Sequence, residues 1–232
     1  MRLTLRTLAA LLSYPSDELR SHVPDLRAAL AEEAALPRRL REGLEPLLSR
    51  LERYEVLESQ AAFTDLFDRS RALSLHLFEH VHGDKRERGQ AMLDLAEQYM
   101  QQGLLLETDE LPDHIPVFLE FASCLPRNEA METLAQPAHV LAALEQRLRE
   151  RGSDYAAVFA AALALSAAAP DDEALEALQR NAPSDDPARI DEEWEEKAVT
   201  FTDAHDMGGP TGFVARMRAK GRAMTAARRS QS

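Results

Sequence analysis

The chain has 232 residues, a formal net charge of −13, 45% apolar residues and one cysteine. The apolar share is enough for a sizeable core, and the length fits one domain followed by a tail. The negative charge argues against nucleic-acid binding as the main activity. One cysteine excludes an intrachain disulfide framework and a cysteine zinc site, which favours a reducing cytoplasm. Helix-forming residues dominate over β-branched ones, so we predict an all-α fold.

The first third of the chain shows helical spacing interrupted by prolines. An apolar stripe over residues 5–12 predicts a first helix that ends before Pro15. The apolar run there is too short for a signal peptide, and no segment of the chain approaches the length of a membrane span. Ser16 is expected to cap a second helix, which Pro24 kinks or splits, and Pro37 opens a third.

The middle of the chain continues the helical pattern. One apolar pattern runs from Tyr54 to a stop at Gly83, and Asp84 then caps a helix that ends at Gly103. Further helices are expected at about 117–125, 128–135, 138–151, 154–168 and 171–180. Residues 1–180 are therefore predicted to form a single globular helical bundle of about nine to eleven helices.

The composition changes after residue 180. Residues 181–206 form an acidic linker that contains Trp194, the only tryptophan, and residues 207–232 hold six basic and no acidic residues. A flexible solubilising tail is the favoured interpretation of this basic segment. The alternative is an anchor on anionic lipid, because VARMRAKGRAM places apolar and basic residues at helical spacing.

Three histidines in the segment HLFEHVH are candidate metal ligands. His76 and His80 would lie one turn apart on a continuous helix, and His82 follows. Two imidazoles placed in this way can share a zinc ion. The segment lacks the glutamate of an HExxH motif, and a third ligand would have to come from elsewhere, so a helix end at an interface is favoured. A metal-binding protein or enzyme that uses these histidines is the alternative function.

The next turn, DKRERG, is predicted to be structural. Basic residues at a helix start can bind phosphate, but a Gly-rich loop is missing. We therefore assign structural support to this turn and to the glycine that ends the helix: Asp84, Arg86, Arg88, Gly89 and Gly103. Arg86 and Arg88 are expected to pair with Asp68 or Glu79. Cys124 is interpreted as a small buried apolar residue. No nucleophile–base motif is present, so an enzyme is not supported.

The step Pro112-Asp113-His114 is the strongest candidate site. Two prolines, Pro112 and Pro116, fix the backbone and present a carboxylate beside an imidazole at a helix start. Such a pair could hold a basic or hydrogen-bonding group of a ligand. Simple capping of the helix by Asp113 is the alternative.

Several segments together resemble a known family. They are LLSYPSDEL (11–19), Tyr54 with Phe67-Asp68, LHLFEHVHGDKRERGQAM (75–92), Tyr99, Gly103, ELPDHIPVFLEF (110–121) and DEEWEEKAVTF (191–201). This combination is similar to the NarJ-type nitrate reductase molybdenum cofactor assembly chaperones, within the TorD/DmsD-like family of redox-enzyme maturation chaperones.

The resemblance implies a cytoplasmic, non-catalytic chaperone with a TorD-like fold. Its client would be the apo catalytic (alpha) subunit of a membrane-bound respiratory nitrate reductase, held through an N-terminal helix that resembles a twin-arginine leader. The chaperone would hold no cofactor stably itself, but would assist insertion of molybdenum cofactor and an iron–sulfur cluster into the client. Molybdenum cofactor biosynthesis proteins are further expected partners. Nucleic-acid binding and stable membrane insertion are not expected, and the chain would be a monomer or weak dimer.

An acidic helical domain suits a basic amphipathic client helix, which an apolar groove with carboxylates at its rim would bind. We expect the groove to be lined by Tyr54, Phe63, Phe67, Leu104 and Phe118. Asp68, Asp113 and Glu110 would meet the client's basic residues at the rim, and His114 would be a pH-sensitive contact. The bend that begins at Pro112 would form the rigid lip.

Overall fold

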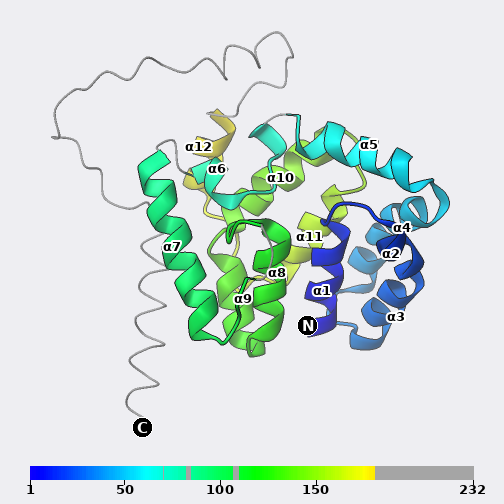
Figure 1. Ribbon diagram of the computed structural model, residues 1–232, viewed down its shortest axis with the longest axis horizontal. Coiled ribbons are helices and arrows are strands. Elements are labelled where there is room, and N and C mark those ends of the chain that lie inside the picture. Colours follow the sequence, from blue (N-terminus) through cyan, green and yellow to red (C-terminus); the bar gives the residue numbers. More distant parts are fainter. Residues whose placement is uncertain (70, 82–84, 107–109, 181–232) are drawn as a thin grey trace, which may run out of the picture.

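The computed structural model describes residues 1–69, 71–81, 85–106 and 110–180 (Figure 1). Within these ranges the chain forms twelve α-helices and one short 3-10 helix. Their bounds are α1 Arg2–Leu11, α2 Asp17–Ser21, α3 Val23–Glu33, α4 Arg38–Arg53, α5 Val56–Phe67, η1 Arg71–Leu73, α6 Leu77–Val81, α7 Lys85–Gln101, α8 Ile115–Cys124, α9 Arg127–Ala135, α10 Ala138–Glu150, α11 Ala156–Ala164 and α12 Asp172–Arg180.

Helix α1 is the centre of the core. Leu5, Leu8 and Leu11 share one face of the helix and are fully buried, where α1 packs against α3, α8 and α11. The first turn of α1 is held from α3, because the Glu33 carboxylate accepts hydrogen bonds from the backbone N–H and the hydroxyl of Thr4, each at 2.7 Å. Burial of this apolar face makes α1 the element on which both halves of the domain are assembled.

The proline and cap signals of the N-terminal third produced the expected helix ends. The Ser16 hydroxyl accepts a hydrogen bond from the backbone N–H of Leu19 at 3.1 Å, so it caps α2. Pro24 stands in the first turn of α3, and the chain is split there into α2 and α3. Pro37 directly precedes α4, as predicted.

The C-terminal helices cover the other side of α1. Helix α8 packs on α1, and α10 packs on α11 and α12. Arg147 of α10 ties two other segments to this layer: its guanidinium donates to the backbone oxygen of Ala72 at 2.7 Å and to that of Leu178 at 2.9 Å. Gly152, with a φ of 65°, ends the turn after α10 at the position where a left-handed residue is needed.

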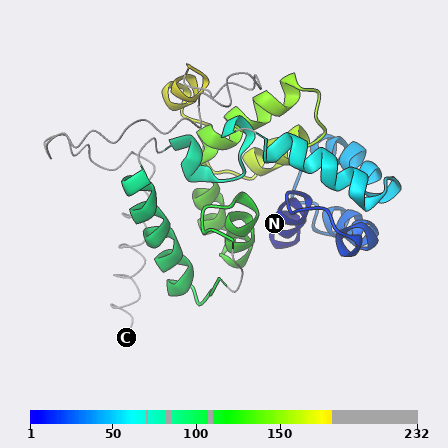
Figure 2. The same ribbon diagram turned by 45° about the horizontal axis from the view of Figure 1, so that its top comes forward.

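Helix α7 lies at the outside of the domain, beside α8 and α9 (Figures 1 and 2). It buries Ala91, Leu95 and Tyr99 along its inner face. Gly103, with a φ of 79°, follows the helix and allows the backbone N–H of Leu104 to bond the oxygen of Tyr99 at 3.0 Å. This is the left-handed helix end expected at Gly103.

The all-α prediction is confirmed, but two expectations were wrong. The pattern from Tyr54 to Val81 is not one helix: α5 ends at Phe67, and η1 and α6 follow as separate short elements. Helices are therefore more numerous than the nine to eleven predicted. Cys124, the last residue of α8, is exposed rather than buried.

Within the described ranges, no helix is long and apolar enough to cross a membrane. Gly83, Asp84 and His82, the linker 181–206 and the tail 207–232 lie outside the described residues. The predicted division of the chain at residue 180 stays a prediction.

Candidate functional site

Two segments far apart in the sequence are paired side by side at the N-terminal ends of α6 and α8. The backbone N–H of Leu77 donates to the oxygen of Asp113 at 3.0 Å, and that of Ile115 donates to the oxygen of Leu75 at 2.8 Å. His76 and His114 therefore form an isolated antiparallel bridge, and their rings stack with centroids 5.2 Å apart. We call this paired segment, residues 75–77 and 113–115, the clasp.

The Asp113 side chain organises the clasp from below the surface. It is fully buried, and its carboxylate accepts hydrogen bonds from the Phe78 backbone N–H at 3.1 Å and from His76 Nδ1 at 3.2 Å. The carboxylate thus caps the first turn of α6. A guanidinium nitrogen of Arg88 lies 4.0 Å away. A buried carboxylate needs such partners, because an uncompensated one would be strongly destabilising.

Contacts from α7 hold the same region. The Tyr99 hydroxyl donates to the backbone oxygen of Pro112 at 2.8 Å, and burial raises the pKa of Tyr99 further above its usual range. The Arg88 guanidinium lies 3.1 Å from the carboxylate of Glu79 on α6. The predicted pairing of Arg88 with Glu79 is therefore present, and α7 fixes both sides of the clasp.

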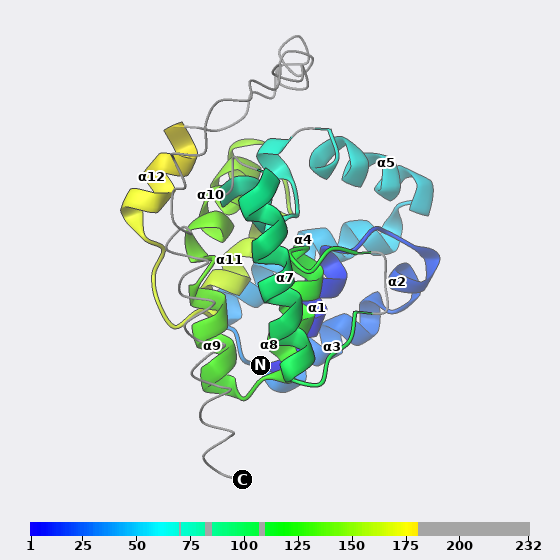
Figure 3. The ribbon, with the colours of Figure 1, turned by 60° about the vertical axis from the view of Figure 1, so that its left-hand side comes forward.

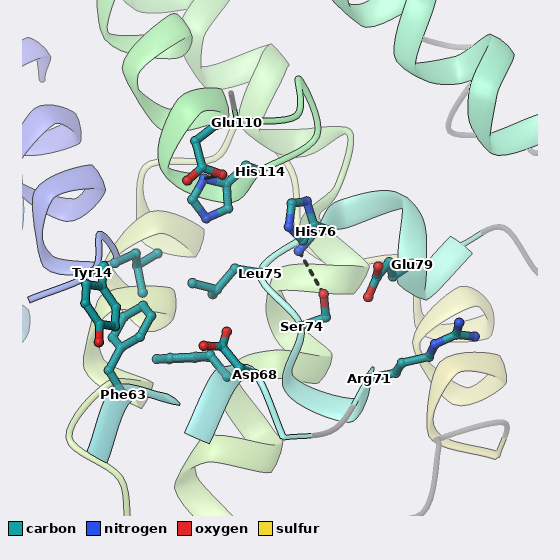
Figure 4. Close-up of a pocket in the computed structure, with 12 residues that line it drawn as sticks. Tyr14, Phe63, Asp68, Arg71, Ser74, Leu75, His76, Glu79, Glu110 and His114 are labelled. Atoms are coloured by element: carbon teal, nitrogen blue, oxygen red, sulfur yellow. Dashed lines mark hydrogen bonds and ion pairs between the residues drawn. The ribbon is translucent and has the colours of Figure 1, made fainter. Parts of the chain in front are cut away.

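A cavity of about 480 Å³ opens beside the clasp, between α1, α5, η1 and the turn before α8 (Figure 4). It has an apolar side and a polar side. Its lining residues are Leu12, Tyr14, Phe63, Phe67, Asp68, Arg71, Ser74, Leu75, His76, Glu79, Glu110 and His114. We call this cavity the groove. Its volume is typical of ligand sites, and seven of its twelve lining residues are polar or charged.

The apolar side of the groove is a cluster of aromatic rings. The Phe63 ring lies 4.7 Å from that of Phe67 and 5.8 Å, edge to face, from that of Tyr14. Beneath them Tyr155 packs edge to face on Phe67 at 5.1 Å, and burial raises the pKa of Tyr155 to about 12. Tyr14 remains 54% exposed, so the cluster presents aromatic surface to the opening.

The polar side of the groove carries more negative than positive charge. Asp68, Glu79 and Glu110 supply three carboxylates, and Arg71 is the one arginine among the lining residues (Figure 4). Asp68 and Glu110 are exposed, so they form a carboxylate rim at the opening. An apolar wall with such a rim suits a basic amphipathic segment.

The pKa values of the two stacked histidines shift in opposite directions. The hydrogen bond to Asp113 raises the pKa of His76, whereas burial lowers the pKa of His114. The Glu110 carboxylate lies 3.3 Å from His114 Nδ1, but out of line for a hydrogen bond, and this buried nitrogen has no hydrogen-bond partner in the described structure. This nitrogen is therefore enclosed, with the Glu110 carboxylate as its charged neighbour.

The structure separates the histidines that the sequence grouped. His76 precedes α6 and faces Asp113, whereas Nε2 of His80 donates to the backbone oxygen of Ser74 at 2.8 Å. Burial lowers the pKa of His80 to about 4, so His80 is a neutral, structural histidine. Among the described residues no three potential ligands gather as a metal site would need.

Five of the predicted groove residues come together there: Phe63, Phe67, Asp68, Glu110 and His114. The other five do not line it. Phe118 is in the core and Asp113 is fully buried, so a place for Asp113 at the rim does not agree with the structure. Tyr54 is half exposed at the end of α4, and Leu104 and Pro112 lie outside the lining, where Pro112 instead receives the Tyr99 hydroxyl.

Sequence reasoning did not assign Tyr14, Leu75 or Arg71 to the groove. A signal for Tyr14 was available, because it directly precedes the proline that ends the first helical segment. Side chains at such helix ends often face a neighbouring element. Leu75 and Arg71 reach the groove because the helix breaks after Phe67. The apolar spacing of the sequence did not show this break.

The fold and the groove define a helical binding module. Its residues 33–161 match the model of the nitrate reductase delta subunit family. The chain is 44% identical over 195 residues to the nitrate reductase molybdenum cofactor assembly chaperone NarJ of Escherichia coli K12, covering 84% of this chain and 83% of the relative. It is 35% identical to the probable chaperone NarW of the same strain, over 85% and 83% of the two chains, and 32% identical to the probable NarJ of Bacillus subtilis, over 67% and 83%.

This chain belongs to the nitrate reductase delta subunit family. The names of its relatives denote an assembly chaperone rather than a catalytic enzyme.

Proposed function

We propose that this protein is a dedicated chaperone for the apo catalytic subunit of a respiratory nitrate reductase. It binds the N-terminal, leader-like helix of that subunit in the groove and acts in the cytoplasm. The client stays competent for insertion of molybdenum cofactor and the iron–sulfur cluster, and the chaperone leaves before membrane attachment. The names of the relatives support the client and the cofactor.

The observation that carries the proposal is the combination of an aromatic wall with a carboxylate rim. Tyr14 and Phe63 present aromatic surface to the opening, and Asp68 and Glu110 stand at its edge. An amphipathic helix would place apolar side chains one turn apart against the rings, and its arginine or lysine side chains would reach the carboxylates.

The clasp explains why Asp113 matters to such a site although it does not line it. Its carboxylate fixes His76 and the start of α6, and these set the polar side of the groove. We therefore assign Asp113 a positioning role. Pro112 shares this role, because its backbone oxygen is fixed by Tyr99.

Calorimetric titration with a peptide of the client's N-terminus tests the proposal. Asp68→Asn and Glu110→Gln should each weaken binding about 1.4- to fivefold, because exposed ion pairs contribute roughly 0.2–1 kcal/mol. Glu32→Gln, an exposed carboxylate of α3 outside the groove, is the matched control and should leave the affinity unchanged. Equal affinity of all variants would refute the carboxylate rim as the contact surface.

The client itself is tested separately. In cells short of molybdenum cofactor, the proposed chaperone accumulates with its apo client, so the catalytic subunit of nitrate reductase should co-purify with this chain. Recovery of a different molybdoenzyme subunit would overturn the choice of client. The peptide titration above would still test whether the groove is the binding site.

A further inference from the structure

The outer face of α7 carries an apolar stripe that the groove does not use. Leu93, Ala96 and Met100 follow one another at spacings of three and four residues, so they lie on one side of the helix. Leu93 is 66% exposed and Met100 is 54% exposed. The core-facing residues Leu95 and Tyr99 lie on the opposite side, so the stripe faces away from the core. Helix α7 itself lies at the outside of the domain, in front of α8 in Figure 3.

Apolar surface continues past the end of the helix. Leu105, two residues beyond Gly103, is 73% exposed, and Leu106 is 37% exposed. Single exposed leucines are ordinary on a protein surface, but a series of them on one element marks an interaction surface. We call Leu93, Ala96, Met100 and Leu105 the α7 stripe.

The neighbourhood of the α7 stripe is acidic. Residues 93–103 contain two carboxylates, Asp94 and Glu97, and no basic residue, and Arg88 in the preceding turns faces inward to Glu79. Glu97 lies one turn from Leu93, at the edge of the stripe. A partner for this surface should therefore combine apolar side chains with positive charge.

The chain itself contains a segment of this chemistry. Residues 213–224, FVARMRAKGRAM, lie outside the described residues and carry four basic and no acidic side chains. At helical spacing Phe213, Met217 and Met224 share one side, and the basic residues flank it. Thirty-two residues separate Arg180 from Phe213. A linker of this length can span up to roughly 110 Å, so it is long enough for the segment to reach the α7 stripe.

We propose that residues 213–224 of the same chain dock on the α7 stripe. Phe213, Met217 and Met224 cover Leu93 and Met100, and the flanking arginines and lysine lie against the carboxylates beside the stripe. This inference is independent of the proposed function, because the α7 stripe and the groove share no residue.

Trypsin reports on this contact directly, because all six basic residues of 207–232 fall between 216 and 229. A linker gives an effective concentration on the order of 1 mM, so a contact with a Kd of about 0.2 mM would be closed about five-sixths of the time. Cleavage of the tail in the full chain should then be about sixfold slower than cleavage of a free peptide 207–232.

Three variants make the test specific. Leu93→Glu with Met100→Glu should raise tail cleavage to the rate of the free peptide. Leu57→Glu is the matched control, because Leu57 is a leucine of α5 that is 80% exposed and outside the stripe, and it should leave the tail protected. Met217→Glu should release the tail without any change to the folded domain.

Three results would overturn the proposal. Cleavage of the wild-type tail at the rate of the free peptide would show that nothing covers it. Protection that disappears on dilution of the protein would show that the occupant is the tail of a second copy. Retained protection in the Leu93→Glu/Met100→Glu variant would place the tail on another surface and would equally refute docking on α7.

Discussion

The pH dependence of stability provides a quantitative test of the surroundings of His80, on α6 next to the clasp. The pKa of His80 is lowered from 6.5 to about 4 by burial, and its Nε2 donates to the Ser74 backbone oxygen. Because the folded-state pKa lies below the unfolded value, the unfolded state takes up the proton first as the pH falls. The contribution of His80 is complete above pH 6.5 and is lost progressively between pH 6.5 and pH 4.

The magnitude follows from these two pKa values. Between pH 8 and pH 5 the shift removes about 2 kcal/mol from the free energy of unfolding, at 1.36 kcal/mol per pKa unit. His76 shifts in the opposite direction because Asp113 stabilises its charged form, so its contribution is present below pH 6.5 and is lost as the pH rises through its raised folded pKa. The pH dependence of the wild type alone therefore does not isolate His80.

His80→Gln isolates it, because glutamine can still donate a hydrogen bond but does not titrate. Urea unfolding of both proteins at pH 8 measures the structural cost of the substitution. The same measurement at pH 5 also includes the effect of protonating His80 on the free energy of unfolding. We expect the wild type to lose about 2 kcal/mol more than the variant between the two pH values. Parallel losses would show that His80 is not the buried neutral group that the structure describes.

Three further predictions concern the fold around the groove and can all be checked by urea unfolding. Phe63→Ala should cost about 3–5 kcal/mol, since Phe63 is 5% exposed within the aromatic cluster, whereas Leu57→Ala on the same helix should change stability by less than about 0.5 kcal/mol. Equal effects would contradict the burial of the cluster. Ser16→Ala should cost about 1 kcal/mol through loss of the α2 cap, and Ser16→Asn should restore most of it. Gly103→Ala should cost about 1–2 kcal/mol, because the φ of 79° is strained for any residue with a Cβ; no loss would mean that the helix end relaxes.

Much of the fold could be predicted because its signals are local. A serine before a helical stripe, a proline at a helix start and a glycine at a helix end act within one turn, and Ser16, Pro37 and Gly103 all behaved as their chemistry requires. The break after Phe67 was missed because apolar residues continue through η1 and α6. Those residues are buried, but against α10 and the clasp rather than along one helix.

The site was predicted less well, because it depends on pairings between distant segments. Asp113 is a charged residue of the kind expected at the rim of a groove. Its burial depends on contacts with Phe78 and His76, which lie 35 and 37 residues away in the sequence. His76 and His80 share a spacing that fits metal binding on a continuous helix. The helix starts only at Leu77, so their rings have different surroundings. Such contacts leave no periodic pattern in the sequence.

The clasp has a consequence for the way the domain can open. The two backbone hydrogen bonds between residues 75–77 and 113–115 join the two ends of the chain segment that contains α6 and α7. That segment is therefore a loop whose base, which we call the neck, is closed by the clasp. Amide exchange in the outer turns of α7 can therefore proceed by local opening, while the amides of Leu77 and Ile115 exchange only when the neck itself parts. An insertion in the exposed turn after Gly103 should accordingly be tolerated, since the closure entropy grows slowly with length and the neck keeps its two ends together.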